Sequence, residues 1–73
     1  MFDVVQSATV DPFPSKLRWW RRRRGLTQHN LATRAGLSRS YLARVETARH
    51  DPTLTVLRKL AKALRVDIAK LLR

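Results

Sequence analysis

The sequence lacks cysteine altogether, which excludes disulfides, thiol catalysis and zinc sites built from cysteine. It contains only two histidines, His29 and His50, and only five acidic residues. These side chains are too few for a metal site, or for a nucleophile with a base and an orienting group. We therefore expect no enzymatic activity, no bound metal and no cofactor.

Long apolar runs are also absent. No segment approaches the roughly 20 apolar residues of a membrane span. The start of the chain, MFDVVQSATV, lacks the basic residues and the long apolar stretch of a signal peptide. We expect a cytoplasmic protein that does not bind membranes. The segment RWWRRRR leaves a rival interpretation open, because membrane-active peptides also interleave aromatic residues with arginines.

Acidic residues are scarce relative to basic ones. The chain has 16 lysines and arginines, a formal net charge of +11 and a pI near 11.9. A surface of this charge favours a polyanionic partner, and nucleic acid is the commoner polyanion. A chain of 73 residues is long enough for one domain with a modest core.

The composition changes near Pro12. We interpret residues 1–11 as an N-terminal arm, either flexible or paired as a short strand with a second chain. From Pro12 onward apolar residues recur at helical spacing, so residues 12–73 are predicted to form one all-α domain. The predicted helices run from Pro12 to just before Gly25, over 28–35, over 39–47, over 54–64, and over a short last stretch that contains Ile68, Leu71 and Leu72. In the 54–64 helix one apolar stripe is expected, made of Leu54, Leu57, Leu60, Ala61 and Leu64.

The segment from Gln28 to Val45, QHNLATRAGLSRSYLARV, is typical of two short helices joined by a tight turn. Helices that cross at roughly 90 to 120° need a small residue at the contact, which Ala32 provides. Gly36 can end the first helix in the left-handed conformation, and the Ser38 hydroxyl can cap the next helix. The pattern predicts a helix-turn-helix.

Further motifs extend this pattern: GLTQ, the LA before AGLS, the YL and VE of the 39–47 helix, the helix start at Pro52 to Leu54, and LAKALRV. Residues 13–72 are thereby similar to the DNA-binding domain of the Cro and phage-repressor, or XRE-type, helix-turn-helix regulators. The resemblance implies a compact five-helix, lambda-repressor-like domain in which the second and third helices form the helix-turn-helix. It also implies a homodimer that inserts the third helix into the major groove of a near-palindromic operator.

By the same resemblance the chain is a sequence-specific transcriptional regulator, a repressor, encoded by a prokaryote or a phage. Its expected partner is double-stranded DNA. Small proteins of this family also act as antitoxins, which bind a toxin protein and repress their own promoter, and this alternative stays open. Residues 1–11 are the only candidate segment for such a protein partner.

The resemblance also assigns the residues that contact DNA. Arg39 lies in the first turn of the third helix, where a guanidinium can donate two hydrogen bonds to O6 and N7 of guanine. Gln28 opens the second helix, whose unpaired backbone N–H groups attract a phosphate, and its amide can brace Arg39. The predicted base-reading residues are Ser38, Arg39, Ser40, Ala43 and Arg44. The predicted phosphate-binding residues are Thr27, Gln28, Tyr41, Arg49, His50 and Thr53.

Two pairs of residues carry structural expectations. Glu46 is the only glutamate, and the resemblance places Arg21 beside it as a bidentate ion pair that ties the first helix to the third. Trp20 shares the helix face of Leu17 and is expected to be buried. Trp19 is expected near the surface, stacked under an arginine.

Other positions depart from the family or exceed what the fold needs. Ala48 and Arg65 stand where many members have glycine, so each must adopt a strained left-handed conformation or reshape its turn. The last helix is more apolar than a terminal turn requires. By resemblance the dimer contact lies near it, with Leu72 as the residue to test.

Overall fold

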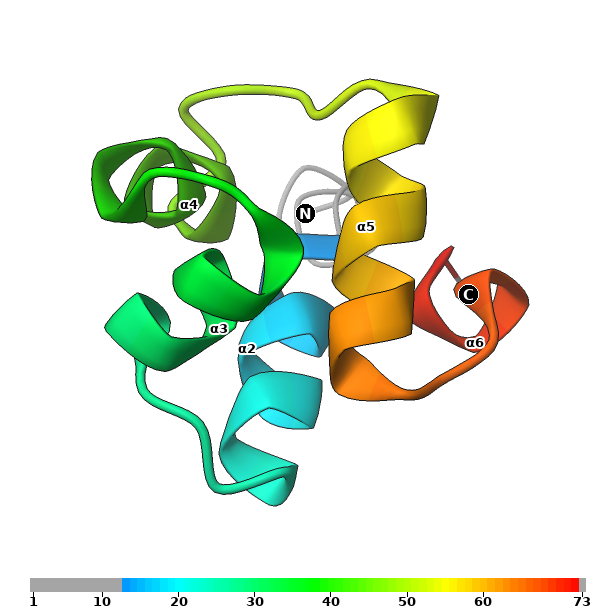
Figure 1. Cartoon of the computed structure of the whole chain (residues 1–73). Coiled ribbons are helices and arrows are strands. Elements are labelled where there is room, and N and C mark those ends of the chain that lie inside the picture. Colours follow the sequence, from blue (N-terminus) through cyan, green and yellow to red (C-terminus); the bar gives the residue numbers. More distant parts are fainter. Residues whose placement is uncertain (1–12, 73) are drawn as a thin grey trace, which may run out of the picture.

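The computed structural model describes residues 13–72, which form five helices and no strand. Figure 1 shows α3 and α4 on one side of the molecule, α5 and α6 on the other, and α2 between and behind them. The helices are α2 (Phe13–Arg23), α3 (Gln28–Ala35), α4 (Arg39–Glu46), α5 (Leu54–Leu64) and α6 (Ile68–Leu72). The predicted five-helix, all-α fold is confirmed. The predicted arm, residues 1–11, lies outside the described residues.

Three of the helices begin at a residue whose hydroxyl caps the first turn. Thr27 accepts a hydrogen bond from the backbone N–H of the third helical residue of α3, and Ser38 and Thr53 do the same for α4 and α5. Each cap satisfies a backbone donor that has no partner inside its helix. These contacts fix where the helices start, and they agree with the predicted boundaries of α3 and α5. The helix predicted over 39–47 ends at Glu46, because Thr47 has left the helical conformation.

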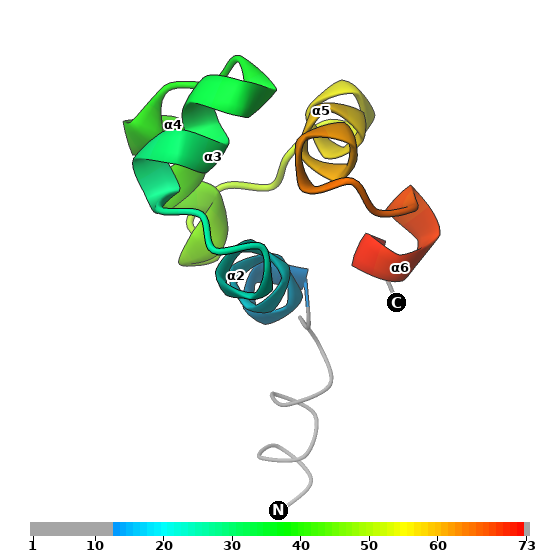
Figure 2. The ribbon, with the colours of Figure 1, turned by 60° about the horizontal axis from the view of Figure 1, so that its bottom comes forward.

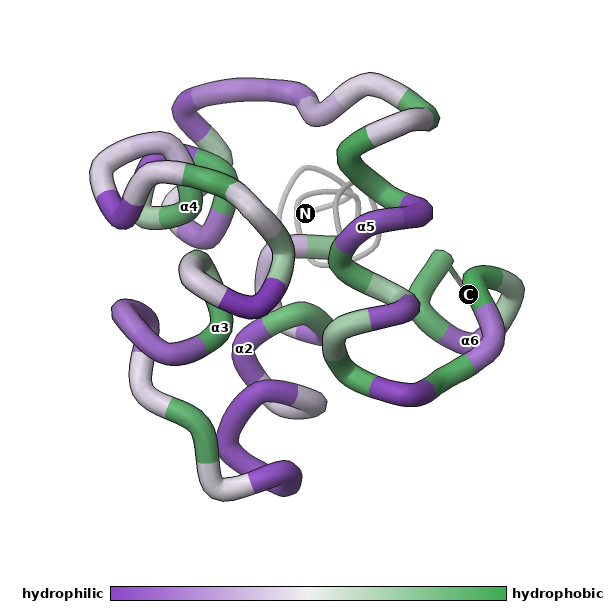
Figure 3. Tube along the Cα trace, in the orientation of Figure 1, coloured by the Kyte–Doolittle hydropathy of each residue, from purple (hydrophilic) through white to green (hydrophobic). Residues whose placement is uncertain are grey.

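The core consists of leucines and small residues drawn from every helix. Ala32, only 2% exposed, lies in the core where α3 packs against α4 and α5. Figure 3 shows apolar and hydrophilic residues alternating along α5, as a half-buried helix requires. The buried apolar residues are Leu17, Leu31, Ala32, Ala35, Leu42, Val45, Leu60, Ala61, Leu64 and Leu71.

Two expectations about burial need correction. The apolar stripe of α5 was expected to include Leu54, yet this side chain is 53% exposed because the first turn of α5 extends beyond the core. Trp20 was expected to be buried, yet it is only half-buried. Trp20 lines a recess together with Lys70 of α6, and Figure 2 shows α6 on the same side of the molecule as α2.

Two turns hold a side-chain-bearing residue in the left-handed region, where glycine is usual. Ala48 has φ 61° and Arg65 has φ 57°, so both adopt the strained conformation rather than reshape the turn. Each such residue costs about 1 kcal/mol. The turn at Arg65 is held from outside, because Arg24 donates from Nε to the Leu64 carbonyl at 2.7 Å and from Nη2 to the Arg65 carbonyl at 3.3 Å.

Candidate nucleic-acid interface

The α4 helix has one buried and one exposed face. Leu42 and Val45 are buried in the core. Arg39, Ser40 and Arg44 are exposed to solvent. In Figure 1 the start of α3 and the whole of α4 lie along the left side of the molecule, and the loop from α4 to α5 runs across the top. The exposed face of α4 is therefore free to meet a partner along its length.

The remaining predicted base-reading residues are less open. Ser38 is exposed, but its Oγ already accepts a hydrogen bond from the Tyr41 backbone N–H at 3.0 Å. Ala43 is half-buried, so at most part of its methyl group faces outward. Arg39 and Arg44 are consequently the α4 side chains with the greatest reach.

A buried carboxylate joins α4 to α2. Glu46 is 1% exposed and Arg21 is 12% exposed at the side chain. Arg21 donates from Nε to Glu46 Oε2 at 2.7 Å and from Nη2 to Oε1 at 3.1 Å, so the pair is bidentate. Its third nitrogen, Nη1, donates to the Leu26 carbonyl at 3.0 Å. Because a guanidinium holds two oxygens in one plane, the pair fixes the angle of α4 against α2.

The same carboxylate also receives a side chain from α3. Gln28 donates from Nε2 to Glu46 Oε1 at 3.1 Å. The amide is therefore directed at Glu46, and the proposed bracing of Arg39 by Gln28 stays a prediction. Glu46 thus connects α2, α3 and α4, and every helix of the helix-turn-helix reaches it.

Arg18 was not singled out from the sequence. Its guanidinium donates to the backbone carbonyl of Glu46, at the end of α4. Thr47 adds a second contact there, donating from Oγ1 to the Ala43 carbonyl at 2.8 Å. The available signal was spacing, since Arg18 precedes Arg21 by three residues and shares its helix face.

The predicted phosphate-binding residues lie at the helix starts and in the loop after α4. The Thr27 and Thr53 hydroxyls are engaged as caps, while the N-terminal backbone of their helices faces the surface. Arg49 and His50 are exposed in the loop. The half-buried Tyr41 packs edge-on against His50 with ring centroids 4.8 Å apart, which ties α4 to this loop.

Within residues 13–72, no three histidine or acidic side chains lie together as metal ligands. The helices found between these residues are all too short or too polar to span a bilayer.

The fold and the exposed face of α4 define a helix-turn-helix protein. A helix-turn-helix family model matches residues 17–71, and the chain belongs to this family, that of the Cro and phage-repressor, XRE-type proteins. Membership places the domain among those of DNA-binding transcriptional regulators rather than enzymes.

Relatives and solved structures agree with this assignment. The chain is 47% identical over 49 residues to the immunity repressor protein of Bacillus phage phi105, which is 67% of this chain and 34% of the repressor. It is 43% identical over 51 residues to the HTH-type transcriptional regulator y4dJ of Sinorhizobium fredii, covering 70% of this chain and 66% of that protein. The chain thus spans between about a third and two thirds of these relatives.

One solved structure covers nearly the whole domain. The restriction-modification controller protein C.AhdI from Aeromonas hydrophila superposes with a TM-score of 0.82 at 38% sequence identity. The match covers 88% of this chain and 97% of that one. The arrangement of the five helices is therefore shared with a protein of almost the same extent.

Proposed function

We propose that this protein is a sequence-specific transcriptional repressor that inserts α4 into the major groove of a near-palindromic operator. The observation that carries the proposal is the division of α4. Leu42, Val45 and the Glu46 ion pair anchor its buried side, while Arg39 and Arg44 are exposed to solvent. A helix held rigidly by one face can present the other to base edges in a fixed register. Such a regulator acts in the cytoplasm.

Within this proposal the predicted residues divide by role. Arg39, in the first turn of α4, reads guanine, and its neighbours on the exposed face contribute to the same groove contacts. The starts of α3 and α5, with Arg49 and His50, hold phosphates on either side of the groove. Phosphate contacts set the register of the helix on DNA but carry no sequence information themselves.

The proposed homodimer is supported by apolar surface near the end of the chain. Leu72 is 47% exposed. It lines a small groove of about 170 Å³ whose walls include the apolar Phe13 and Leu57 and, at the loop after α4, the polar His50 and Asp51. On an operator with two half-sites, a twofold dimer must hold its two α4 helices about one DNA turn, roughly 34 Å, apart.

Selection of bound duplexes from random DNA tests the function. We expect enriched sites with two related half-sites in inverted orientation, centred about one helical turn apart. Enrichment of sites that share no sequence would overturn sequence-specific binding. Enrichment of single, unrepeated half-sites would overturn the dimer alone.

Substitution of Leu72 by Asp tests the interface. We expect the variant to sediment as a folded monomer and to bind the selected operator more weakly than the unchanged protein. If Leu72→Asp remains dimeric while removal of residues 1–11 abolishes the dimer, the arm rather than the α6 groove holds the two copies together.

A further inference from the structure

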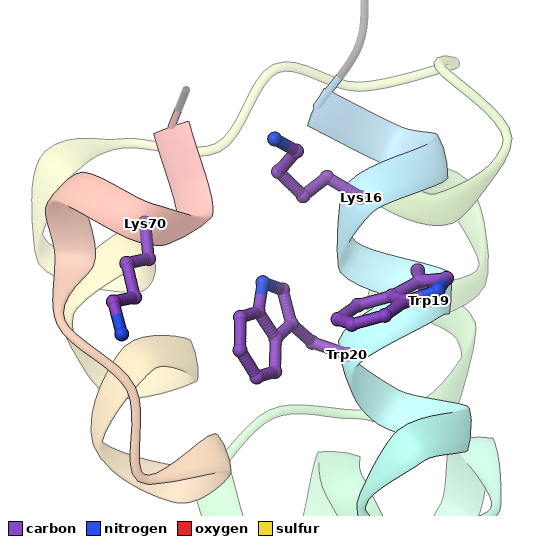
Figure 4. Close-up of a pocket in the computed structure, with 4 residues that line it drawn as sticks. All are labelled: Lys16, Trp19, Trp20 and Lys70. Atoms are coloured by element: carbon purple, nitrogen blue, oxygen red, sulfur yellow. The ribbon is translucent and has the colours of Figure 1, made fainter.

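A second recess lies between α2 and α6. It has a volume of about 390 Å³ and is lined by Lys16, Trp19, Trp20 and Lys70. Figure 4 shows the Trp20 ring projecting from α2 into the space between the two helices, with Lys70 of α6 facing it across the gap and Trp19 on its other side. The α4 helix contacts α2 through Arg18 and Arg21, so the recess belongs to a different face of α2.

Both indole side chains on this side of α2 are at least partly exposed to solvent. Trp19 is 53% exposed and Trp20 is half-buried. Their rings meet edge to face, with centroids 4.9 Å apart and an interplanar angle of 86°. The edge of one indole therefore meets the face of the other, and the two rings together form one aromatic surface.

The indoles are held in place by neighbouring guanidinium groups. The Arg23 guanidinium lies 5.3 Å from the Trp19 ring centroid, and that of Arg24 lies 5.2 Å from the Trp20 ring centroid. Arg24 is itself fixed by its hydrogen bonds to the carbonyls at the end of α5. Arg24 therefore ties the Trp20 ring to the end of α5 before any ligand arrives, which reduces the entropy lost on binding.

The charged residues that line the recess are both basic. Lysines stand on both walls, Lys16 on α2 and Lys70 on α6, and none of the lining residues is acidic. Among residues 13–72 no carboxylate pairs with Lys70. The recess therefore combines a preformed aromatic surface with positive charge at its rim, which suits a ligand that is both planar and anionic.

We propose that this recess binds an unpaired nucleobase together with its phosphate. The base stacks against the exposed indole surface, and the phosphate lies at the rim near Lys70. Aromatic platforms flanked by basic residues bind unpaired bases in this way with little sequence preference. The nucleotide can come from a free mononucleotide or from a single strand of nucleic acid, and both offer the same chemistry. Because the recess is not on the α4 face, a duplex and an unpaired base can be held at once.

Intrinsic fluorescence reports on this site directly, because Trp19 and Trp20 are the only tryptophans of the chain. The experiment titrates the whole protein with adenosine monophosphate and, separately, with single-stranded oligothymidylate, exciting where nucleobases do not absorb. Ribose 5-phosphate and inorganic phosphate serve as probes without a base. We expect saturable quenching by at least one base-containing probe and weaker or no binding of the probes without a base. Binding of adenosine monophosphate identifies a free nucleotide as a sufficient ligand, and binding of oligothymidylate alone identifies a strand.

Two matched lysine variants distinguish binding in the recess from nonspecific attraction to the positive charge of the protein. Lys70→Gln is expected to weaken base-dependent quenching by about twofold to fivefold, the effect of losing one exposed charge contact. Lys62→Gln removes the same charge from α5, outside the recess, and is expected to leave quenching unchanged. Trp19→Leu is expected to weaken binding further, read from the remaining Trp20, with far-ultraviolet circular dichroism confirming that each variant is folded.

Several results would overturn the proposal. The first is that neither base-containing probe quenches the fluorescence in a saturable way, and the second is that inorganic phosphate binds as tightly as they do. The third is that Lys62→Gln and Lys70→Gln weaken quenching equally. The last is that quenching depends on the concentration of the protein and not on that of the ligand. The last result would mean that a second copy covers the recess. None of these results bears on operator binding, which is measured with duplex DNA and depends on α4.

Discussion

Arg21, in α2, and Arg24, just after it, are chemically the same as the arginines on and after α4, but they differ in what they contact. Arg21 donates to a buried carboxylate and Arg24 to backbone carbonyls at the end of α5. Arg39, Arg44 and Arg49 are exposed, and within residues 13–72 their side chains have no hydrogen-bond or ionic partner. The net charge of +11 counts both groups alike. The second group has no partner within the described domain, so its guanidinium groups can contact phosphates directly, whereas Arg21 and Arg24 already hold other helices in place.

The largest expected effect is the salt dependence of operator binding. Each neutralised phosphate contributes about 0.9 to the slope of log affinity against log salt, so about four to seven contacts per subunit give a slope of about −3.6 to −6.3 per subunit. We expect Arg49→Ala to make this slope shallower by about one unit per subunit. Arg24→Ala should leave it unchanged, because its guanidinium is already occupied.

Binding titrations across a range of salt concentrations measure these slopes. A flat response in the unchanged protein would contradict the phosphate contact at Arg49, whereas the neutral contacts at Gln28 and Thr53 release no counterions and do not contribute to the slope. Equal changes in Arg24→Ala and Arg49→Ala would mean that the two groups of arginines act alike, and the distinction between them would be wrong.

The second effect concerns stability. Glu46→Ala leaves the largely buried Arg21 without its carboxylate and removes the acceptor of Gln28, so we expect a loss of about 2 to 4 kcal/mol of unfolding free energy. That is a large part of the stability of a small domain. Chemical denaturation measures the loss, and the preferred operator sequence should not change.

Asp51→Ala is the matched control, because Asp51 is an exposed carboxylate in the loop after α4. We expect its unfolding free energy to change by less than about 0.5 kcal/mol. Equal effects of the two substitutions would mean that the Glu46 network adds nothing specific to the stability of the domain.

The helices and the caps could be predicted from the sequence because both are local. Thr27, Ser38 and Thr53 each cap the turn that follows them, and apolar spacing fixes which face of a helix is buried. The contacts of Arg18, Arg24 and Gln28 could not be predicted in this way. Their long side chains reach acceptors on other helices, and the choice of acceptor depends on how those helices are packed.

Trp20 illustrates the same limit. Helical spacing correctly placed it on the face of Leu17, but spacing does not reveal how far away the next helix lies. A five-residue α6 leaves the indole half-exposed beside Lys70 instead of covering it. For the interface, the sequence indicated which α4 residues face outward, and their contacts with DNA stay predictions.

The third effect is on base preference. If Arg39 reads one guanine in each half-site, Arg39→Ala should cost about 1 to 3 kcal/mol per half-site and relax the preference at that base pair alone. Arg49→Ala should weaken binding to all sequences alike. Affinities for a set of operators with single-base changes distinguish these outcomes. If Arg39→Ala weakens all sequences equally and Arg44→Ala alters one preference, α4 is rotated from the proposed position.

The smallest effect lies in the turns. Ala48 occupies the left-handed region at φ 61°. A glycine there avoids a steric cost of about 1 to 2 kcal/mol. It also lowers stability by about 0.5 to 1 kcal/mol, because glycine loses more backbone entropy than alanine when the chain folds. Ala48→Gly should therefore stabilise the domain by about 0.5 to 1 kcal/mol, seen as a rise in Tm of about 2 to 8 °C. Arg58→Gly, in the middle of α5, should instead destabilise the domain by about 1 kcal/mol. A fall in Tm for Ala48→Gly would show that the turn after α4 is not strained, and the alanine would then be a normal part of it.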